Sequence, residues 1–128
     1  MSHIQLKRIY EGVEQSDGKR ILVDRIWPRG VTKEEARLTV WMKEIAPSHP
    51  LRQFFGHVPE RFEAFKALYI AELDADSVQP FLLKLRKWAE RDTITLLYAA
   101  KDKQYNHAVI LKEYLDQLNA KNPLGEVL

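Results

Sequence analysis

Side chains that could bind an anion or move a proton gather in two short segments far apart in the sequence. The first segment, DRIWPRG at residues 24–30, contains Asp24, Arg25 and Arg29 around a tryptophan. The second segment, YAAKDKQYNH at residues 98–107, contributes further polar groups: Tyr98, Lys101, Asp102, Asn106 and His107. Arginine and lysine side chains and free backbone N–H groups are common ligands of phosphate and carboxylate. The two segments therefore predict an anion site, provided that the fold brings them together.

Asp24 and His107 are the members of this set that could transfer protons. We expect His107 in the first turn of a helix, at the border of the inward face. A neutral imidazole at the positive end of a helix dipole suits a general base or a hydrogen-bond donor. Asp24 could orient that imidazole, or act as an acid or base itself, so this pair is the candidate catalytic group. The candidate ligand-binding residues are Arg25, Arg29, Tyr98, Lys101 and Asn106.

Each of these residues also has a purely structural interpretation. Asp24 could form a buried ion pair that locks a loop, with one of three cations as its partner: Arg25, Arg29 or Lys101. Asn106 is well placed to cap a helix, and His107 could be a hydrogen-bonded histidine of the core. If the ion-pair lock is correct, Asp24 and Arg29 satisfy each other and no accessible cavity lies beside them.

The strands that must position both segments follow from the hydrophobic pattern. We predict strands near residues 4–10, 20–26 and 93–98, and the last is apolar and β-branched, as a strand covered on both faces would be. The pair Asp17-Gly18 favours a tight turn, so the first two strands could pair antiparallel. If strands 20–26 and 93–98 are parallel neighbours, both segments meet at the sheet edge where open α/β sheets bind ligands.

Five helices follow from apolar residues at helical spacing, near residues 33–37, 48–55, 59–73, 77–90 and 107–118. Thr32 with Glu35 forms a capping-box pattern, Ser48 is a cap, and Pro59 is a first-turn proline. Strands and helices together predict a single α/β domain over residues 1–128, with a small, partly parallel sheet. The tail at residues 119–128 has no period of its own and could be irregular.

The composition narrows the possible chemistry and partners. The 128 residues include 20 Lys and Arg against 18 Asp and Glu, a formal net charge of +2, and no cysteine. Thiol chemistry is excluded, and so small a charge does not by itself indicate a nucleic-acid or membrane partner. The histidines show no metal-binding spacing. Without an apolar stretch for a signal peptide or a membrane span, we expect a cytoplasmic protein.

Four segments resemble, in order and spacing, the YeaO-like family of domain of unknown function 488: VDRIWPRGV, LRQFFGH, PERFEAFKALYIAEL and TLLYAAKDKQYNHAVILKEYL. The resemblance extends from about Ile4 to Leu118. The positions that it carries over are Asp24, Arg25, Trp27, Pro28, Arg29, Gly30, Gly56, His57, Tyr98, Ala99, Asn106, His107 and Ala108.

The resemblance implies no reaction, because the family is defined without a function. A more distant branch is similar at the last motif but has cysteines at the positions of Tyr98 and Asn106, and an arginine at Ala108. If that branch uses thiol or metal chemistry, this chain departs from it. His107 is then the only candidate site residue that this chain shares with that branch.

The sequence is compatible with three functions. The chain could be an enzyme for a small phosphate- or carboxylate-bearing substrate, with Arg25, Arg29 and Lys101 on the anion and Asp24 and His107 handling protons. It could bind a nucleotide, a nucleic-acid end or another anion without catalysis. It could also be a small structural or interaction protein with an internal ion-pair lock. We expect an anion-binding cleft, with an enzyme slightly ahead of a pure binder, and the sequence names no cofactor and no oligomeric state.

Overall fold

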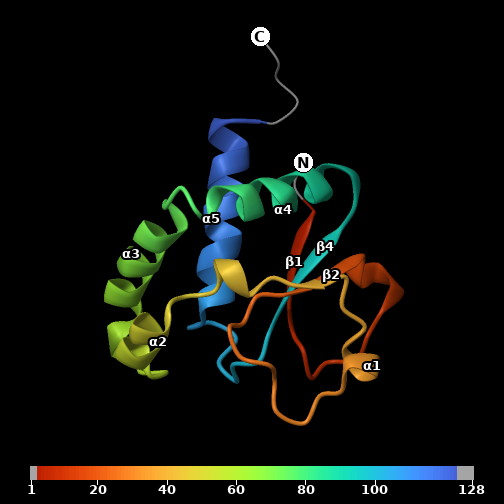
Figure 1. The fold of residues 1–128 in the computed structure, drawn as a ribbon, viewed down its shortest axis with the longest axis horizontal. Helices are drawn as coiled ribbons and strands as arrows, with labels where there is room; N and C mark the ends of the chain where they lie inside the picture. Colours follow the sequence, from red (N-terminus) through yellow and green to blue (C-terminus); the bar gives the residue numbers. More distant parts are fainter. Residues whose placement is uncertain (1–2, 124–128) are drawn as a thin grey trace.

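The computed structural model describes residues 3–123, and a four-stranded sheet forms its centre (Figure 1). The strands are β1 (Ile4–Arg8), β2 (Lys19–Leu22), β3 (Val40–Trp41) and β4 (Ile94–Tyr98). Their order is β1-β4-β2-β3, and every neighbouring pair is parallel. The carboxyl ends of β1 and β4 therefore share one edge, in the lower part of Figure 1. The predicted α/β class is confirmed, with a sheet that is parallel across the described residues.

β4 is the central strand, and the prediction that both of its faces are covered is confirmed. All five of its residues, Ile94 to Tyr98, are buried. Ile94, Leu96 and Tyr98 pack into the larger core, formed with the long helices. Leu97 packs on the other face in a smaller cluster that includes Leu22 and the half-buried Trp27. A strand with apolar contacts on both faces reads as a continuous apolar run, which explains its clear sequence signal.

The connection between β1 and β2 is a crossover, so the predicted antiparallel pairing is wrong. β4 lies between the two strands and pairs in parallel with both. Asp17, expected in a hairpin turn, is buried, and its carboxylate accepts hydrogen bonds from Lys7 and Arg20. Gly18 has a φ of 62°, and a Cβ there would lie 2.1 Å from the Thr93 carbonyl oxygen. Asp17 thus supplies a buried charge, and Gly18 allows a close approach of two backbone segments. In the sequence alone, the same Asp-Gly pair indicates a turn.

All five predicted helices are present within residues 3–123. They are α1 (Lys33–Ala36), α2 (His49–Phe55), α3 (Phe62–Leu73), α4 (Gln79–Arg91) and α5 (His107–Lys121), together with the short 3-10 turns η1 (Gln15–Asp17), η2 (Lys43–Ile45) and η3 (Pro59–Arg61). None of the helices described is long and apolar enough to cross a membrane. α5 ends three residues beyond its predicted end at 118, and residues 124–128 of the predicted tail lie outside the described residues.

The predicted helix starts are confirmed by their hydrogen bonds. Thr32 and Glu35 form the reciprocal capping box at α1. The Ser48 hydroxyl accepts from the backbone of α2, and the Asn106 side-chain oxygen accepts from Val109 N–H at 3.0 Å. These caps are local in sequence, which is why they could be predicted. Ser48 is held in addition by a tertiary contact, since its backbone N–H and its hydroxyl both donate to the Glu72 carboxylate of α3.

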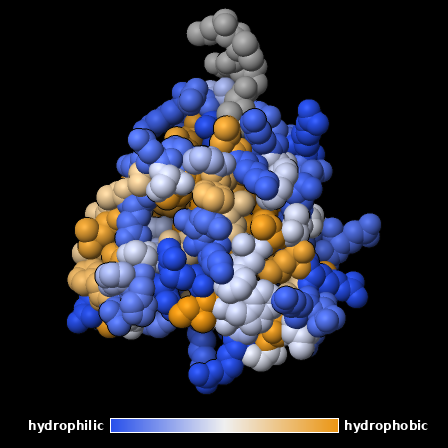
Figure 2. Space-filling model, viewed as in Figure 1, coloured by the Kyte–Doolittle hydropathy of each residue, from blue (hydrophilic) through white to orange (hydrophobic). Residues whose placement is uncertain are grey.

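Helices cover one face of the sheet, with α2 and α3 at the left of Figure 1 and α5 running upward between them and the strands, behind α4. Phe55 of α2 stacks on Phe65 of α3 with ring centroids 4.4 Å apart, and Tyr69 follows in the same row. The Tyr69 hydroxyl donates to Ile45 O at 2.6 Å, and burial raises the pKa of Tyr69 far above its usual value. Figure 2 shows apolar side chains at the left of this face, over α2 and α3.

Candidate functional site

A cleft of about 740 Å³ opens where the loop after β2 meets the loop after β4. β2 and β4 are parallel neighbours, so both loops leave the sheet at the same edge, as the sequence predicted. The cleft is lined by these candidate residues: Asp24, Arg25, Arg29, Lys101, Asn106 and His107. Tyr98 is not among the lining residues, because its side chain is buried in the larger core. Desolvation by that burial raises the pKa of Tyr98.

Asp24 joins three segments at the floor of the cleft. One of its carboxylate oxygens, Oδ2, accepts from Ala99 N–H at 3.0 Å, just beyond the end of β4. The other, Oδ1, is buried and lies 3.2 Å from His107 Nε2, at the start of α5. β2 ends at Leu22, so strand alternation does not separate Asp24 from Arg25, and both side chains line the same cleft.

His107 is the first residue of α5, and its imidazole faces the end of β2. Its Nε2 atom lies 2.9 Å from the carbonyl oxygen of Val23. Because a carbonyl oxygen can only accept, Nε2 carries a hydrogen and donates it to Val23 O, while Asp24 Oδ1 lies near the same nitrogen without a hydrogen bond of its own from residues 3–123. The side chain is 15% exposed, and the ring meets Tyr69 edge-on at 6.1 Å. Within the described chain, Nδ1 is left as the ring nitrogen without a hydrogen-bond partner.

Arg25 contributes positive charge to the cleft while its guanidinium positions a neighbouring loop. Nε donates to Pro47 O at 2.9 Å, and one terminal nitrogen donates to Ala46 O at 3.0 Å. These carbonyls belong to the segment that leads into α2, so Arg25 ties the loop after β2 to the start of that helix. Across residues 3–123, the ion-pair partner near Asp24 is His107, and none of the cations named above takes that place.

The free cations of the cleft come from three different elements. Arg29 and Lys101 are exposed on the two loops, and Arg52 is half-buried on α2. No carboxylate of residues 3–123 lies within ion-pair distance of these three side chains, and none of them donates a hydrogen bond there. The backbone around Arg29 is nevertheless held, because the Tyr10 hydroxyl donates to the Arg29 carbonyl oxygen at 2.8 Å.

Arg52 and His57 are cleft residues that the sequence reasoning did not assign to the site. The spacing along α2 placed Arg52 on a short helix, but no local signal shows that this helix lies beside the two loops. His57 is among the positions shared with the family, but its place after the end of α2 indicates no role by itself. It has a φ of 59°, following Gly56 at 51°, and this left-handed pair turns the chain so that His57 lines the cleft.

Asn106 and Asp102 line the cleft with side chains that are already in use. The Asn106 oxygen caps α5, and its amide nitrogen donates to Asp102 O at 2.8 Å. Asp102 accepts from the backbone N–H groups of Gln104 and Tyr105, and these hydrogen bonds lower the pKa of its carboxyl group. Both residues therefore shape the loop that carries Lys101.

The balance of charge in the cleft is positive. Its lining includes four cations, Arg25, Arg29, Arg52 and Lys101, against the two carboxylates Asp24 and Asp102. Apolar side chains form the rest of the walls: Ile26, Trp27, Pro28, Pro47, Phe55 and Phe65. An anion with an apolar portion matches such a lining, and a cleft of this volume falls within the roughly 300–1,000 Å³ of small-molecule sites. No group of three or more potential metal-binding side chains is found within residues 3–123.

Comparisons with known proteins identify relatives across almost the whole chain. A family model described as the inactive DUF488-N3 subclade matches residues 3–126. Uncharacterized protein YeaO of Escherichia coli strain K12 is 43% identical over 116 residues, which cover 91% of this chain and 99% of YeaO. Uncharacterized protein Rv3073c of Mycobacterium tuberculosis strain H37Rv is 37% identical over 115 residues, covering 90% of this chain and 95% of that protein. No solved structure gives a significant match.

Proposed function

Because the chain belongs to the YeaO-like DUF488 family, within the subclade described as inactive, we propose that its cleft binds a small anionic ligand without converting it. The observation that carries this proposal is the set of unpaired cations at the cleft. Arg29, Arg52 and Lys101 come from three separate elements, yet all three line one cleft, and no carboxylate of the described chain lies within ion-pair distance of them. A hydrogen bond to a charged group contributes about 1.5–3 kcal/mol, so two or three such contacts give a useful affinity.

Of the groups that could catalyse a reaction, Asp24 and the Nε2 atom of His107 are engaged inside the protein. Asp24 Oδ2 accepts from Ala99 N–H, and Oδ1 is buried beside His107. His107 Nε2 faces the Val23 carbonyl oxygen, so this nitrogen is not available to a ligand. A general base must lie within hydrogen-bond reach of the proton that it removes. Asp24 is therefore better suited to holding the floor of the cleft than to acid–base chemistry. The absence of conversion is supported by the description of the family as inactive, since His107 Nδ1 keeps its lone pair free in the described chain.

Isothermal titration calorimetry with inorganic pyrophosphate tests this proposal, because the probe is small, strongly anionic and free of apolar groups. We expect binding that weakens when sodium chloride is raised from 50 to 300 mM. Arg52→Ala and Lys101→Ala should each weaken it by about tenfold, which corresponds to the loss of one charge-assisted contact. Phosphorus NMR of the same mixture after a day should show pyrophosphate unchanged.

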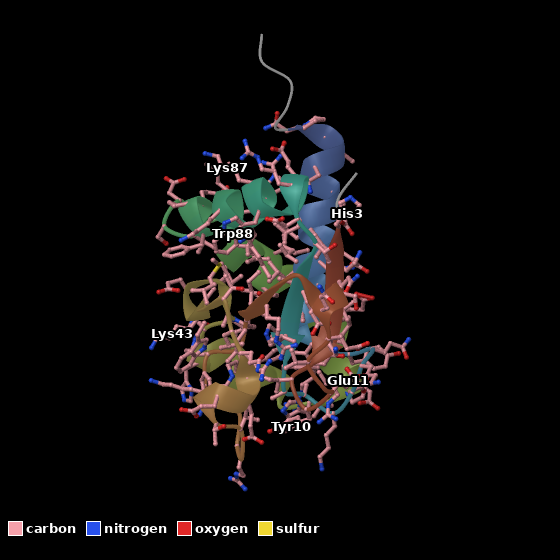
Figure 3. The ribbon with its side chains drawn as sticks, turned by 90° about the vertical axis from the view of Figure 1, so that its right-hand side faces the viewer. His3, Tyr10, Glu11, Lys43, Lys87 and Trp88 are labelled. Carbon is pink, nitrogen blue, oxygen red and sulfur yellow. The ribbon has the colours of Figure 1, made fainter. Side chains whose placement is uncertain are left out.

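Lys87→Ala is the matched control, since it removes one exposed positive charge from α4. Figure 3 shows Lys87 at the other end of the molecule from Tyr10, a residue that lines the cleft. If this variant weakens binding as much as Arg52→Ala, the interaction reports overall charge and the cleft is not the site. Conversion of the probe would contradict the absence of catalysis and restore the enzyme interpretation.

A further inference from the structure

Several hydrogen-bond acceptors around the cleft are occupied by the protein itself. Each accepts at least one internal hydrogen bond: Val23 O from His107, Arg29 O from Tyr10, Pro47 O from Arg25, Ala100 O from Arg8, Asp24 Oδ2 from Ala99 N–H, and Asn106 Oδ1 from Val109 N–H. The side chains that remain open to a ligand include three long donors, Arg29, Arg52 and Lys101, beside fewer acceptors, among them His107 Nδ1 and Asp102 Oδ2. The cleft therefore offers more free donors than free side-chain acceptors.

Exposed apolar surface lies beside these free donors. Ile26 is 56% exposed, the highest value among the large apolar side chains of residues 3–123, and it lines the cleft. Tyr10 is 47% exposed at the same cleft, with its hydroxyl already donated to Arg29 O. Figure 3 shows Tyr10 at the lower end of the molecule, where the strands finish. Trp27 also lines the cleft, and its indole N–H is bonded to Val31 O.

These two features select among anions. The hydroxyl groups of a sugar can hydrogen-bond to the polar groups of the cleft, but they gain nothing from its exposed apolar surface. An aromatic or aliphatic body needs no acceptor and gains by covering Ile26, Tyr10 and Trp27. The volume of about 740 Å³ also exceeds what an isolated phosphate would fill.

We infer that the ligand is an anion with an apolar, ring-sized body, of the aryl phosphate or aromatic carboxylate class, and not a sugar phosphate. The inference rests on the proposed function, because it assumes that the cleft binds an anion at all. In this arrangement Arg29, Arg52 and Lys101 hold the charged group, and Ile26 covers the apolar body.

Calorimetric titration with three related probes tests this choice: inorganic phosphate, phenyl phosphate and ribose 5-phosphate. We expect phenyl phosphate to bind about tenfold more tightly than inorganic phosphate. Ribose 5-phosphate should bind within about twofold of inorganic phosphate. Ile26→Asn should reduce the preference for phenyl phosphate over inorganic phosphate by about fivefold, while Val13→Asn, a matched change at an exposed apolar residue outside the cleft, should leave it intact.

The possible failures can be told apart. If ribose 5-phosphate binds as tightly as phenyl phosphate, or if Ile26→Asn leaves the preference unchanged, the apolar ligand is excluded while anion binding stands. If none of the three probes binds, and pyrophosphate does not bind either, the proposed function fails and this inference fails with it.

Discussion

Charged residues at the beginning of β2 are buried and paired, whereas those of the cleft beyond its end are not paired with a carboxylate of the described chain. At its beginning, Arg20 is buried, and it donates to Asp17 Oδ2 at 2.6 Å and to Ala36 O at 3.0 Å. Lys7 of β1 completes this buried cluster by bonding to the same aspartate at 3.0 Å. Beyond its end, the exposed Arg29 lies at the cleft with the half-buried Arg52 of α2, and neither has a carboxylate partner within residues 3–123.

The comparison shows that residue type alone does not separate structural from functional charge. Both regions combine arginines with an aspartate close to a strand end. In the first, the aspartate neutralises the cations, so removal of one partner leaves a buried charge without compensation. In the second, Asp24 is engaged with a histidine and a backbone N–H, so the cations stay available.

The largest expected effect is the loss of the buried carboxylate in Asp17→Asn. The change leaves Arg20 buried without a counter-charge, and the free energy of unfolding should fall by about 3–5 kcal/mol. Urea unfolding followed by circular dichroism measures it. The control is Glu14→Gln, at the exposed acidic partner of Lys7, which should cost no more than about 1 kcal/mol. If the free energy of unfolding falls equally in the two variants, the buried carboxylate of Asp17 stabilises the protein no more than the exposed one of Glu14.

The same cluster predicts how stability depends on pH. Burial acts to raise the pKa of Asp17, but hydrogen bonds from Glu14 N–H, Lys7 and Arg20 outweigh it and hold this pKa below 3.8. The unfolded chain therefore binds a proton at higher pH than the folded one. The stabilisation is present above about pH 4 and is lost as the pH falls through the folded value. Unfolding free energies measured from pH 5 to pH 2 should fall more steeply in the natural chain than in Asp17→Asn.

An intermediate effect is expected for Asp24→Asn at the cleft. The asparagine oxygen can still accept from Ala99 N–H, but its amide group would point one donor at the hydrogen of His107 Nε2. Thermal and urea unfolding should show a loss of about 1–3 kcal/mol. A loss as large as that of Asp17→Asn would place both aspartates in one structural class and remove the contrast between the two regions.

The smallest expected effect on stability is that of Arg52→Ala. Because this side chain has no partner in the described chain, the free energy of unfolding should change by about 0.5 kcal/mol or less, while pyrophosphate affinity falls. Parallel urea and calorimetric measurements on one preparation provide both numbers. A strong loss of stability with unchanged affinity would give Arg52 a structural role.

Local signals explain why so much of the fold could be predicted. Caps such as Thr32 and Asn106 act within one helical turn, and the apolar run of β4 records its burial directly. The crossover before β2 could not be predicted in this way, because Asp17 is held by Lys7, ten positions away on another strand. β3 is only two residues long, which is too short to show any period.

The site was predictable to the extent that sheet topology determines it. Two loops at the carboxyl ends of adjacent parallel strands must meet, which brought Asp24 and His107 together. The packing of α2 is a tertiary property, so Arg52 was not foreseen. The hydrogen bonds from Arg25 to two backbone carbonyl groups could not be predicted either, since any carbonyl can accept from an arginine.

The most direct test of anion binding in the cleft is a two-dimensional NMR titration of ¹⁵N-labelled protein with inorganic pyrophosphate. The proposal predicts that the largest amide shifts fall around Arg29, Arg52 and residues 99–107, with little change near Lys87 on α4. Shifts that are largest on α4, or that spread evenly over the lysines and arginines, would contradict the claim that this cleft is the binding site.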